Sequence, residues 1–283
     1  MKKITRRSFM AAAGLTVAAL ALTACGGSSS TASSAAASSV ASSAAASSEA
    51  ASAAATELTT VEAGKLTMAT NAAFPPYEMT TDAGEFEGID IETAQAIADK
   101  LGLELQIDDM DFDAALLSVQ QGKADIVMAG VTVTDERKAV MDFSDSYATG
   151  IQSIIVPEGS DIASPDDLAG KTIGTQRGTT GYIYCSDDFG DENVVAYDDG
   201  LTAVQALNNG QVDAVVIDNA PAKEFVAANP GLQILETSYA EEDYAIGMAK
   251  GNTALEDAVN AALEELKADG TLQSIVDKYI TAE

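Results

Sequence analysis

Apolar and polar positions along residues 58–283 follow an alternating series of strand-like and helix-like segments. Short apolar runs are separated by longer segments in which apolar residues recur every three or four positions. This alternation predicts an α/β protein. The predicted strands are Lys65–Thr70, Glu104–Ile107, Ala124–Met128, Thr172–Thr175, Val194–Tyr197 and Asp213–Ile217, and the predicted helices are Ile91–Leu101, Phe112–Gln121 and Leu201–Asn208.

Two of these units resemble each other. LLSVQQGKADIVMAG (116–130) and AVQALNNGQVDAVVIDN (203–219) both contain an apolar helix end, a glycine, two further residues, an aspartate and an apolar strand. Each glycine suits a left-handed helix C-cap. Eight residues after Gly122 comes Gly130, and eight after Gly210 comes Asp218, and both follow a strand end, where open α/β sheets bind ligands. If two similar lobes face each other, Gly130, Thr132 and Asp218 line opposite walls of one cleft.

Acidic residues are frequent at predicted helix starts. Asp90 is the expected N-cap of its helix with Glu92 in the first turn, a structural role. The aspartates around 108–113 and the acidic residues around 187–192 lack the twelve-residue spacing and central glycine of a calcium loop. Capping and solvation explain them better, and we expect no metal ion and no other cofactor.

The N-terminal segment is predicted to be an export signal. MKKITRRSFMAAAGLTVAALALTAC has four basic residues and then an uncharged run from Phe9 to Ala24, too short to span a bilayer comfortably. Leu22-Thr23-Ala24-Cys25 resembles a lipobox, so residues 1–24 are expected to be removed and Cys25 to carry a lipid anchor. Twin-arginine and general secretory export both stay open.

A tether and a strongly acidic domain follow. Residues 25–61 are expected to form the lipidated cysteine and an Ala/Ser-rich flexible linker. Four of the 15 Lys and Arg residues precede Cys25, which leaves 11 against 44 Asp and Glu. This charge excludes a nucleic-acid partner. The absence of histidine excludes Ser-His-Asp and Cys-His sites, and the lone thiol beyond Cys25, Cys185, cannot form an intrachain disulfide.

Arg137 stands out in AGVTVTDERKAVMDFSD (129–145). Thr134 is a good N-cap, and Asp135 and Glu136 suit the positive end of a helix dipole, but a cation in the first turn opposes that dipole. One interpretation is a local surface ion pair with Glu136. The other is that Arg137 binds an external anion at the helix start. Beyond Cys25 the chain has only one other arginine, Arg177, which favours the second interpretation.

Taken together, several segments resemble family 3 of the bacterial extracellular solute-binding proteins, the polar amino-acid group that serves ABC importers. The resemblance spans almost the whole chain after the linker, and Thr93 departs from the bulky aliphatic residue usual in the family. It is carried by NAAFPPYE (71–78), GIDIETAQAIADKLG (88–102), MDFDAALLSVQQGKADIVMAGVTVTDERKAVMDFSDSY (110–147), DLAGKTIG (167–174) and VDAVVIDNAPA (212–222).

The resemblance implies a set of ligand contacts. Arg137 would hold an amino acid's α-carboxylate, with Thr132 and the backbone N–H groups near Thr179 and Thr180. Asp218 would pair with the α-ammonium, together with Thr132 and the Gly130 carbonyl. Phe74 and Phe112 would enclose the side chain. Asn71 and Gln176 occupy positions that vary with the ligand, and since both are neutral amides a polar, uncharged side chain is expected.

The resemblance also implies the architecture: a type II periplasmic-binding-protein fold with two α/β lobes, a two-strand hinge and the ligand cleft between them. Lobe 1 is expected at 62–150 plus 243–283 and lobe 2 at 151–242, with crossovers near Tyr147–Ser153 and Glu241–Ile246. Binding would favour lobe closure. The expected partners are a membrane permease with its cytoplasmic ATPase, and the protein is expected to act as an extracytoplasmic, lipid-anchored monomer.

Two other classes remain as alternatives. An enzyme on the same scaffold, resembling periplasmic cyclohexadienyl or arogenate dehydratases, would need a general acid or base such as Asp218 or Glu78. A receptor's sensor domain would need a later apolar span of membrane length, and none is present in the sequence.

Overall fold

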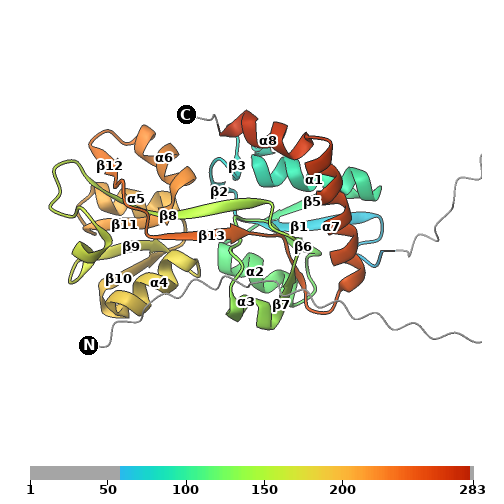
Figure 1. Ribbon diagram of the computed structural model, residues 1–283, viewed down its shortest axis with the longest axis horizontal. Coiled ribbons are helices and arrows are strands. Elements are labelled where there is room, and N and C mark those ends of the chain that lie inside the picture. The colour runs from blue at the N-terminus through green and yellow to red at the C-terminus, as the bar shows by residue number, and fades with distance from the viewer. Residues whose placement is uncertain (1–57, 281–283) are drawn as a thin grey trace, which may run out of the picture. The chain divides into compact units, whose positions relative to one another are not determined.

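Two β-sheets built from the same order of elements form the framework of the protein (Figure 1). The structure, a computed structural model, describes residues 58–280, all within one compact unit, Ala53–Glu283. The predicted signal peptide, Cys25 and nearly all of the predicted linker lie outside the described residues.

The first sheet has the strand order β5-β1-β6-β14-β7. β1 pairs in parallel with β5 and β6, and β14 runs antiparallel to β6 and β7. A small separate sheet has the order β2-β3-β4, and its strands come between β1 and β5 in the chain. The strands are β1 (Lys65–Thr70), β2 (Ala73–Phe74), β3 (Glu78–Thr80), β4 (Phe86–Glu87), β5 (Glu104–Asp109), β6 (Ile126–Val127), β7 (Met141–Phe143) and β14 (Gly247–Ala249).

The second sheet has the order β10-β9-β11-β8-β12, and β13 also pairs with β8. β9 is parallel to β10 and β11, whereas β8 is antiparallel to β11 and β12. Both sheets therefore contain the same sequence of two parallel and two antiparallel pairings. The strands are β8 (Ala148–Pro157), β9 (Ile173–Gln176), β10 (Val194–Tyr197), β11 (Ala214–Asp218), β12 (Leu232–Ile234) and β13 (Ala240–Tyr244).

Helices cover the sheets with their apolar faces. In α7, Leu255, Val259, Ala262, Leu263 and Leu266 are all buried, and they recur three or four positions apart as an amphipathic helix requires. The helices are α1 (Ile89–Leu101), α2 (Phe112–Gln120), α3 (Asp135–Val140), α4 (Thr180–Phe189), α5 (Gly200–Asn208), α6 (Asn219–Ala228), α7 (Thr253–Ala268) and α8 (Thr271–Tyr279), with 3₁₀ turns at Pro165–Leu168 and Asp191–Asn193.

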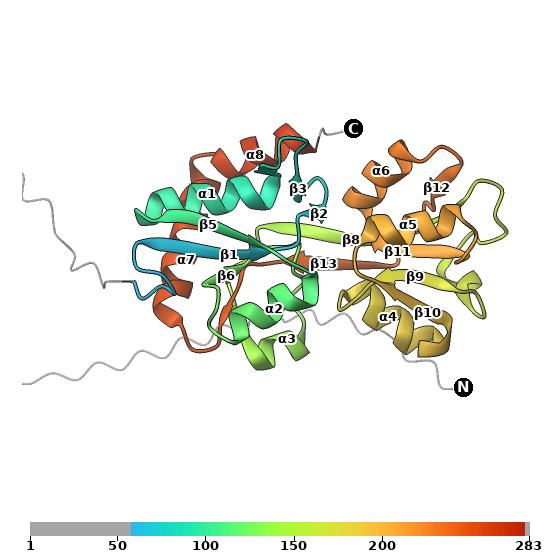
Figure 2. The ribbon, with the colours of Figure 1, turned by 180° about the vertical axis from the view of Figure 1, so that it is seen from behind.

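The strands β8 and β13 connect the regions of the two sheets. β8 and β13 pair antiparallel from Ala148↔Tyr244 to Gln152↔Ala240, and both views show them side by side (Figure 2). They fall at the two predicted crossovers, and the fold has the two lobes and two connecting segments of a type II periplasmic binding protein. The exact lobe limits stay a prediction.

Both predicted glycine caps are confirmed. Gly122 and Gly210 adopt φ values of +65° and +68°. In each unit the glycine N–H donates to the carbonyl three residues earlier, and the following residue's N–H donates to the carbonyl five residues earlier. These paired bonds form a Schellman motif, which satisfies the last carbonyls of α2 and α5.

The expected helix start at Asp90 is wrong. α1 begins at Ile89, with Gly88 as its N-cap, so Asp90 lies inside the first turn and is fully buried. A Cβ on Gly88 would lie 2.2 Å from the Tyr77 carbonyl oxygen, and its φ is +131°. Only glycine tolerates both the contact and this backbone conformation, so the chain turns into α1 two residues earlier than the pattern predicts.

Candidate ligand-binding site

A cavity lies at the C-terminal ends of the central strands. All ten residues predicted as ligand-binding line it, together with Glu78 and Ala129. The ten are Asn71, Phe74, Phe112, Gly130, Thr132, Arg137, Gln176, Thr179, Thr180 and Asp218. The structure thus brings together residues separated by up to 147 positions in the chain, counted from Asn71 to Asp218.

Arg137 points into this cavity from α3. Thr134 caps the helix as predicted, since its hydroxyl accepts from the Arg137 N–H at 3.1 Å. The guanidinium donates from Nη1 to the Thr132 carbonyl at 2.7 Å and from Nη2 to the Gly178 carbonyl at 3.1 Å. Its Cζ lies 5.3 Å from the centre of the Phe112 ring, a cation–π distance. Because Arg137 is only 8% exposed, a surface ion pair with Glu136 does not describe it.

Burial of this guanidinium makes its charge costly. Desolvation lowers the pKa of Arg137, and the negative charge of Glu242, followed by those of other nearby acidic groups, acts in the opposite direction. Two neutral carbonyls use only part of the five N–H donors of an arginine. The side chain is therefore placed to accept an anion in addition to its present partners.

Asp218 is the last residue of β11 and is also buried. Its Oδ2 accepts from Gln152 Nε2 at 2.7 Å, and its Oδ1 accepts from the Tyr244 hydroxyl. Burial raises the pKa of Asp218 to about 7, and the charge of Glu242 adds to this rise. A cation entering the cavity would favour the ionised carboxylate.

Gly130 follows β6 at the position equivalent to Asp218. Its φ is +55°, and an added Cβ would lie 2.8 Å from Phe74 Cε1. The Gly130 N–H donates to Asp90 Oδ2 at 3.0 Å, and the Tyr147 hydroxyl donates to the same oxygen at 2.8 Å. Asp90 therefore holds the cavity-lining Gly130 turn in place, which is a structural role, as the sequence predicted, though not a capping one.

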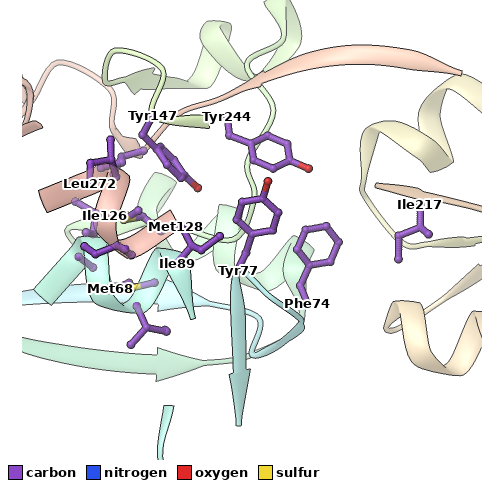
Figure 3. Packing of buried hydrophobic residues seen from close by; sticks show 14 of the residues in the cluster. Met68, Phe74, Tyr77, Ile89, Ile126, Met128, Tyr147, Ile217, Tyr244 and Leu272 are labelled. Carbon is purple, nitrogen blue, oxygen red and sulfur yellow. The ribbon is translucent and has the colours of Figure 1, made fainter. Parts of the chain in front are cut away.

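Aromatic rings form the wall beside Gly130. The Phe74 and Tyr77 rings stack with centroids 5.9 Å apart, and Tyr77 meets Tyr244 edge-on at 5.3 Å. Figure 3 shows these three rings together. Phe74 thus lines the cavity while Tyr77 belongs to the hydrophobic core behind it.

The two amide side chains contact each other across the cleft. Gln176 Nε2 donates to Asn71 Oδ1 at 2.8 Å, and Asn71 Nδ2 donates to the Met110 carbonyl at 2.9 Å. Asn71 follows β1 of the first sheet, whereas Gln176 ends β9 of the second. This hydrogen bond therefore links equivalent positions of the two lobes.

The threonine residues provide hydroxyls and a helix start. Thr179 caps α4 by accepting from the Tyr182 N–H at 3.3 Å. Thr180 is the first residue of α4, so the N–H groups of this first turn face the cavity side of the helix. The hydroxyls of Thr132 and Thr180 both donate to Glu242 Oε2, at 3.0 and 2.9 Å.

Sequence reasoning missed Glu78 as a lining residue and Glu242 as a neighbour of the site. Glu78 is fully buried, and burial, reinforced by the nearby Asp90 charge, raises its pKa well above the usual range. It entered the sequence argument only as a possible enzyme acid. Glu242 lies in AEEDY (240–244), where the period-2 alternation that turns Glu242 and Tyr244 inward could have identified it.

Other singled-out residues lie elsewhere. Arg177 is half-exposed and pairs with Asp198 at 3.4 Å. Cys185 is buried in a hydrophobic cluster with Ile154 and Val216 of the second sheet. Among residues 58–280 no group of three or more acidic, cysteine or histidine side chains is arranged to hold a metal ion. No helix in this part of the chain combines the length and apolar character needed to cross a membrane.

Comparison with known proteins identifies the family. Residues 66–282 match the bacterial extracellular solute-binding proteins, family 3. The L-cystine-binding protein TcyJ of Escherichia coli K12 is 33% identical over 226 residues, covering 78% of this chain and 85% of that protein. A probable histidine-binding protein of Neisseria gonorrhoeae is 32% identical over 279 residues, covering 96% and 95%.

A solved structure is similar as well. An ancestral arginine-binding protein bound to glutamine has a TM-score of 0.75 and 41% identity, covering 78% of this chain and all of that one. The chain therefore belongs to family 3 of the bacterial extracellular solute-binding proteins. Its class is the extracytoplasmic amino-acid-binding component of ABC importers, which are binding proteins rather than enzymes.

Proposed function

We propose that this protein captures one free L-amino acid in the cavity and delivers it to a membrane permease by closing its lobes. The observation that carries the proposal is the presence of one buried cation and one buried anion, Arg137 and Asp218, on the same cavity from different lobes. A zwitterion entering a desolvating cleft needs both fixed charges. Because it would bridge the lobes, it would bind the closed form more tightly than the open one.

The ligand's α-carboxylate would bind Arg137 and the first turn of α4. Arg137 keeps N–H donors beyond the two it gives to Thr132 and Gly178. The N–H groups near Thr179 and Thr180 add the partial positive charge of a ten-residue helix. Together they form a donor set suited to a carboxylate, as the family resemblance implied.

The α-ammonium would bind Asp218, with the Gly130 carbonyl and the Thr132 hydroxyl as further acceptors. The two bonds from Gln152 and Tyr244 orient the Asp218 carboxylate without neutralising it. The ammonium would remove the cost of ionising Asp218, whose pKa burial raises to about 7 in the ligand-free protein.

The ligand's side chain would extend between Phe74 and Phe112 towards Asn71 and Gln176. The neutral amides support a polar, uncharged side chain. A second candidate is a cationic side chain, favoured by Glu78, a buried carboxyl on the same cavity whose two oxygens have no hydrogen-bond donor among the described residues. The ancestral arginine-binding relative, solved with glutamine bound, is consistent with either class.

The place of action is also part of the proposal. We infer that Cys25 carries a lipid that attaches an otherwise monomeric protein to the cell membrane, where the permease and its ATPase lie. The anchor rests on the lipobox-like sequence, since Cys25 lies outside the described residues. A Cys25→Ser variant is expected to leave the membrane fraction on cell fractionation, and its retention there would contradict the anchor.

The central experiment compares the two arginines beyond Cys25. A thermal-shift panel of the twenty standard amino acids plus cystine and ornithine identifies the ligand, because binding raises apparent stability. Calorimetry then measures its affinity for Arg137→Ala and for the matched control Arg177→Ala. We expect a loss of ligand affinity of about 100-fold or more for Arg137→Ala, as for a truncated buried charge pair.

The control Arg177→Ala should keep the wild-type affinity within about twofold, since that exposed ion pair contributes little. Equal affinities of the two variants would refute the carboxylate role of Arg137.

A further inference from the structure

Glu242 is a buried carboxylate directly behind the cavity. It lies in β13, where Glu242 pairs with Gly150 of β8. Along this strand Glu241 and Asp243 are exposed, whereas Glu242, 6% exposed, points inward with Tyr244. Burying a carboxylate costs free energy unless donors compensate it. Its presence here therefore requires an explanation that the amino-acid contacts described above do not supply.

Three donors from three separate elements meet one oxygen of this carboxylate. Glu242 Oε2 accepts from Thr132 Oγ1 at 3.0 Å, Thr180 Oγ1 at 2.9 Å and Gln152 Nε2 at 3.0 Å. Thr132 follows β6 of the first sheet, Thr180 begins α4, and Gln152 lies in β8. Glu242 thus connects both lobes and the hinge strands at the ligand cavity.

This arrangement determines what the two hydroxyls can offer a ligand. A threonine hydroxyl has one proton to donate and two lone pairs that accept. When Thr132 and Thr180 donate their protons to Glu242, their oxygens can only accept from a group in the cavity. Such oxygens attract an ammonium, which has only donors, and repel a carboxylate, which has only acceptors.

We propose that Glu242 is a positioning residue that locks the Thr132 and Thr180 hydroxyls as acceptors, so that these hydroxyls can bind only the ligand's α-ammonium and leave the α-carboxylate to Arg137 and the backbone N–H groups of α4. The inference rests on the proposed amino-acid function and deepens it. Glu242 is not itself among the residues that line the cavity. It acts through the two hydroxyls and through its charge.

The charge distribution agrees with this role. Glu242 is the strongest charged contribution that raises the pKa of Arg137 against the effect of burial. The same charge contributes to the raised pKa of Asp218. Glu242 therefore balances the Arg137 charge in the empty site and adds negative potential where the ammonium would lie.

The test compares Glu242→Met, Glu242→Gln and the matched control Glu241→Gln. Calorimetry uses L-glutamine, L-arginine, L-histidine and L-cystine, and the tightest wild-type binder serves as the probe. In Glu242→Met the acceptor is absent and the hydroxyl protons are free, so the affinity for the probe should be about 100-fold lower than in wild type. Glu242→Gln keeps an oxygen acceptor, so it should bind the probe about tenfold more tightly than Glu242→Met does. Glu241→Gln, an exposed neighbour with the same charge change, should remain within about twofold.

A double-mutant cycle tests whether Glu242 acts through the hydroxyl. In a Thr132→Val background, one of the two locked hydroxyls is already absent, so Glu242→Met should cost at least about threefold less than in wild type. A Glu242→Met loss that is the same in both backgrounds would overturn the proposal, as would wild-type affinity in Glu242→Met.

A ligand-free measurement separates this inference from the proposed function. Carboxyl ¹³C NMR titration of the empty protein should show a lower pKa of Asp218 in Glu242→Gln than in wild type. An unchanged pKa would overturn the idea that Glu242 sets the potential at this wall. If no amino acid of the thermal-shift panel binds wild type while the Asp218 pKa falls, the proposed function fails and the electrostatic role of Glu242 stands.

Discussion

The two helix–glycine–strand units, 116–130 and 203–218, share the same backbone arrangement and differ in the residue at the end of the strand. In each, a left-handed glycine closes the helix, and an aspartate then accepts from the backbone N–H of the neighbouring parallel strand. Asp125 Oδ2 accepts from Thr67 N, and Asp213 Oδ2 accepts from Thr172 N, both at 2.8 Å. Even the reverse bonds, from the aspartate N–H to the Thr67 and Thr172 carbonyls, are repeated.

The units differ in the residue at the end of the strand. The first has Gly130, which has no side chain and so lets the backbone approach Phe74 closely. The second has Asp218, whose carboxylate enters the cavity from the opposite lobe. The repeated unit therefore positions two strand ends, while a single residue at each end decides whether the cavity wall presents backbone or charge.

The largest loss of ligand affinity is expected at Asp218, where the two units differ. Asp218→Asn removes the anion but keeps the shape, so ligand affinity should fall by about 100-fold or more, as for a truncated buried charge partner. Calorimetry with the ligand found by thermal shift measures this. Asp187→Asn, an exposed aspartate in α4 of the same lobe, should bind like wild type. Equal binding by both variants would remove Asp218 from the site.

The two framework aspartates should differ in stability despite their similar bonds. Asp125 is 4% exposed and also accepts from Val61 N at 2.7 Å, whereas Asp213 is exposed. Asp125→Ala leaves the buried Thr67 N–H and the partly buried Val61 N–H without an acceptor and should cost about 2 kcal/mol of unfolding free energy. Asp213→Ala should cost less than half as much. Urea denaturation monitored by circular dichroism checks the ratio, and equal costs would mean that burial does not distinguish the two units.

Asp218, the acidic residue at the end of β11, should also make ligand binding depend on pH. Because the pKa of Asp218 is about 7 in the empty site, binding an ammonium to the ionised form releases a proton. Affinity should therefore rise about tenfold from pH 6 to pH 8 and then level off. Calorimetry in buffers of different ionisation enthalpy counts the released proton. Asp218→Asn should bind weakly with no such rise, and an unchanged slope in that variant would assign the titration to another group.

The same carboxyl affects folding stability in the opposite direction. Its folded pKa lies above the ordinary value of 3.8, so the folded protein holds the proton more tightly than the unfolded chain does. Its contribution to stability is therefore fully present below about pH 4 and is lost as pH rises towards 7. Burial raises the pKa values of Glu78 and Asp90 as well, so both act in the same direction.

The smallest difference is expected at the repeated glycines. Gly122 and Gly210 are both left-handed, and an added Cβ would meet nothing within 4 Å at either. Alanine at each should cost about 1 kcal/mol, the penalty for a left-handed residue with a Cβ, and leave ligand affinity unchanged. Gly130→Ala should cost more and weaken binding, because its Cβ would displace the Phe74 ring. Chemical denaturation and calorimetry on all three variants check this order.

Much of the fold and the site could be predicted from the sequence. Local patterns identified the six predicted strands, which correspond to β1, β5, β6, β9, β10 and β11, as well as the glycine caps and Thr134, since each depends on residues within one or two turns. The spacing from Gly122 and Gly210 identified Gly130 and Asp218, and the resemblance supplied the remaining lining residues. The ligand contacts of these residues stay predictions.

Other features of the site could not be predicted from the local sequence. The Asp90 cap failed because its nearest donors, Gly130 N and the Tyr147 hydroxyl, come from distant segments. In the sequence Glu242 is one of many acidic residues and Glu78 ends a proline-rich loop, so neither was predicted to be buried at the site. The period-2 alternation of β13 could have placed Glu242 on the inner face, but the donors to its carboxylate lie at least 62 positions away and could not be predicted from the local sequence.

The sequence by itself determined the repeated α/β units and the scarcity of arginine, which follow from short-range periodicity, capping chemistry and composition. The family resemblance, in turn, implied Arg137 and Asp218 as the charges that would bind the ligand. Only the tertiary structure decided which carboxylates are buried and what they contact. Desolvation and hydrogen bonding act through space, so Glu242 became a partner of Thr132 and Thr180 only when the two lobes and the hinge strand met around one cavity.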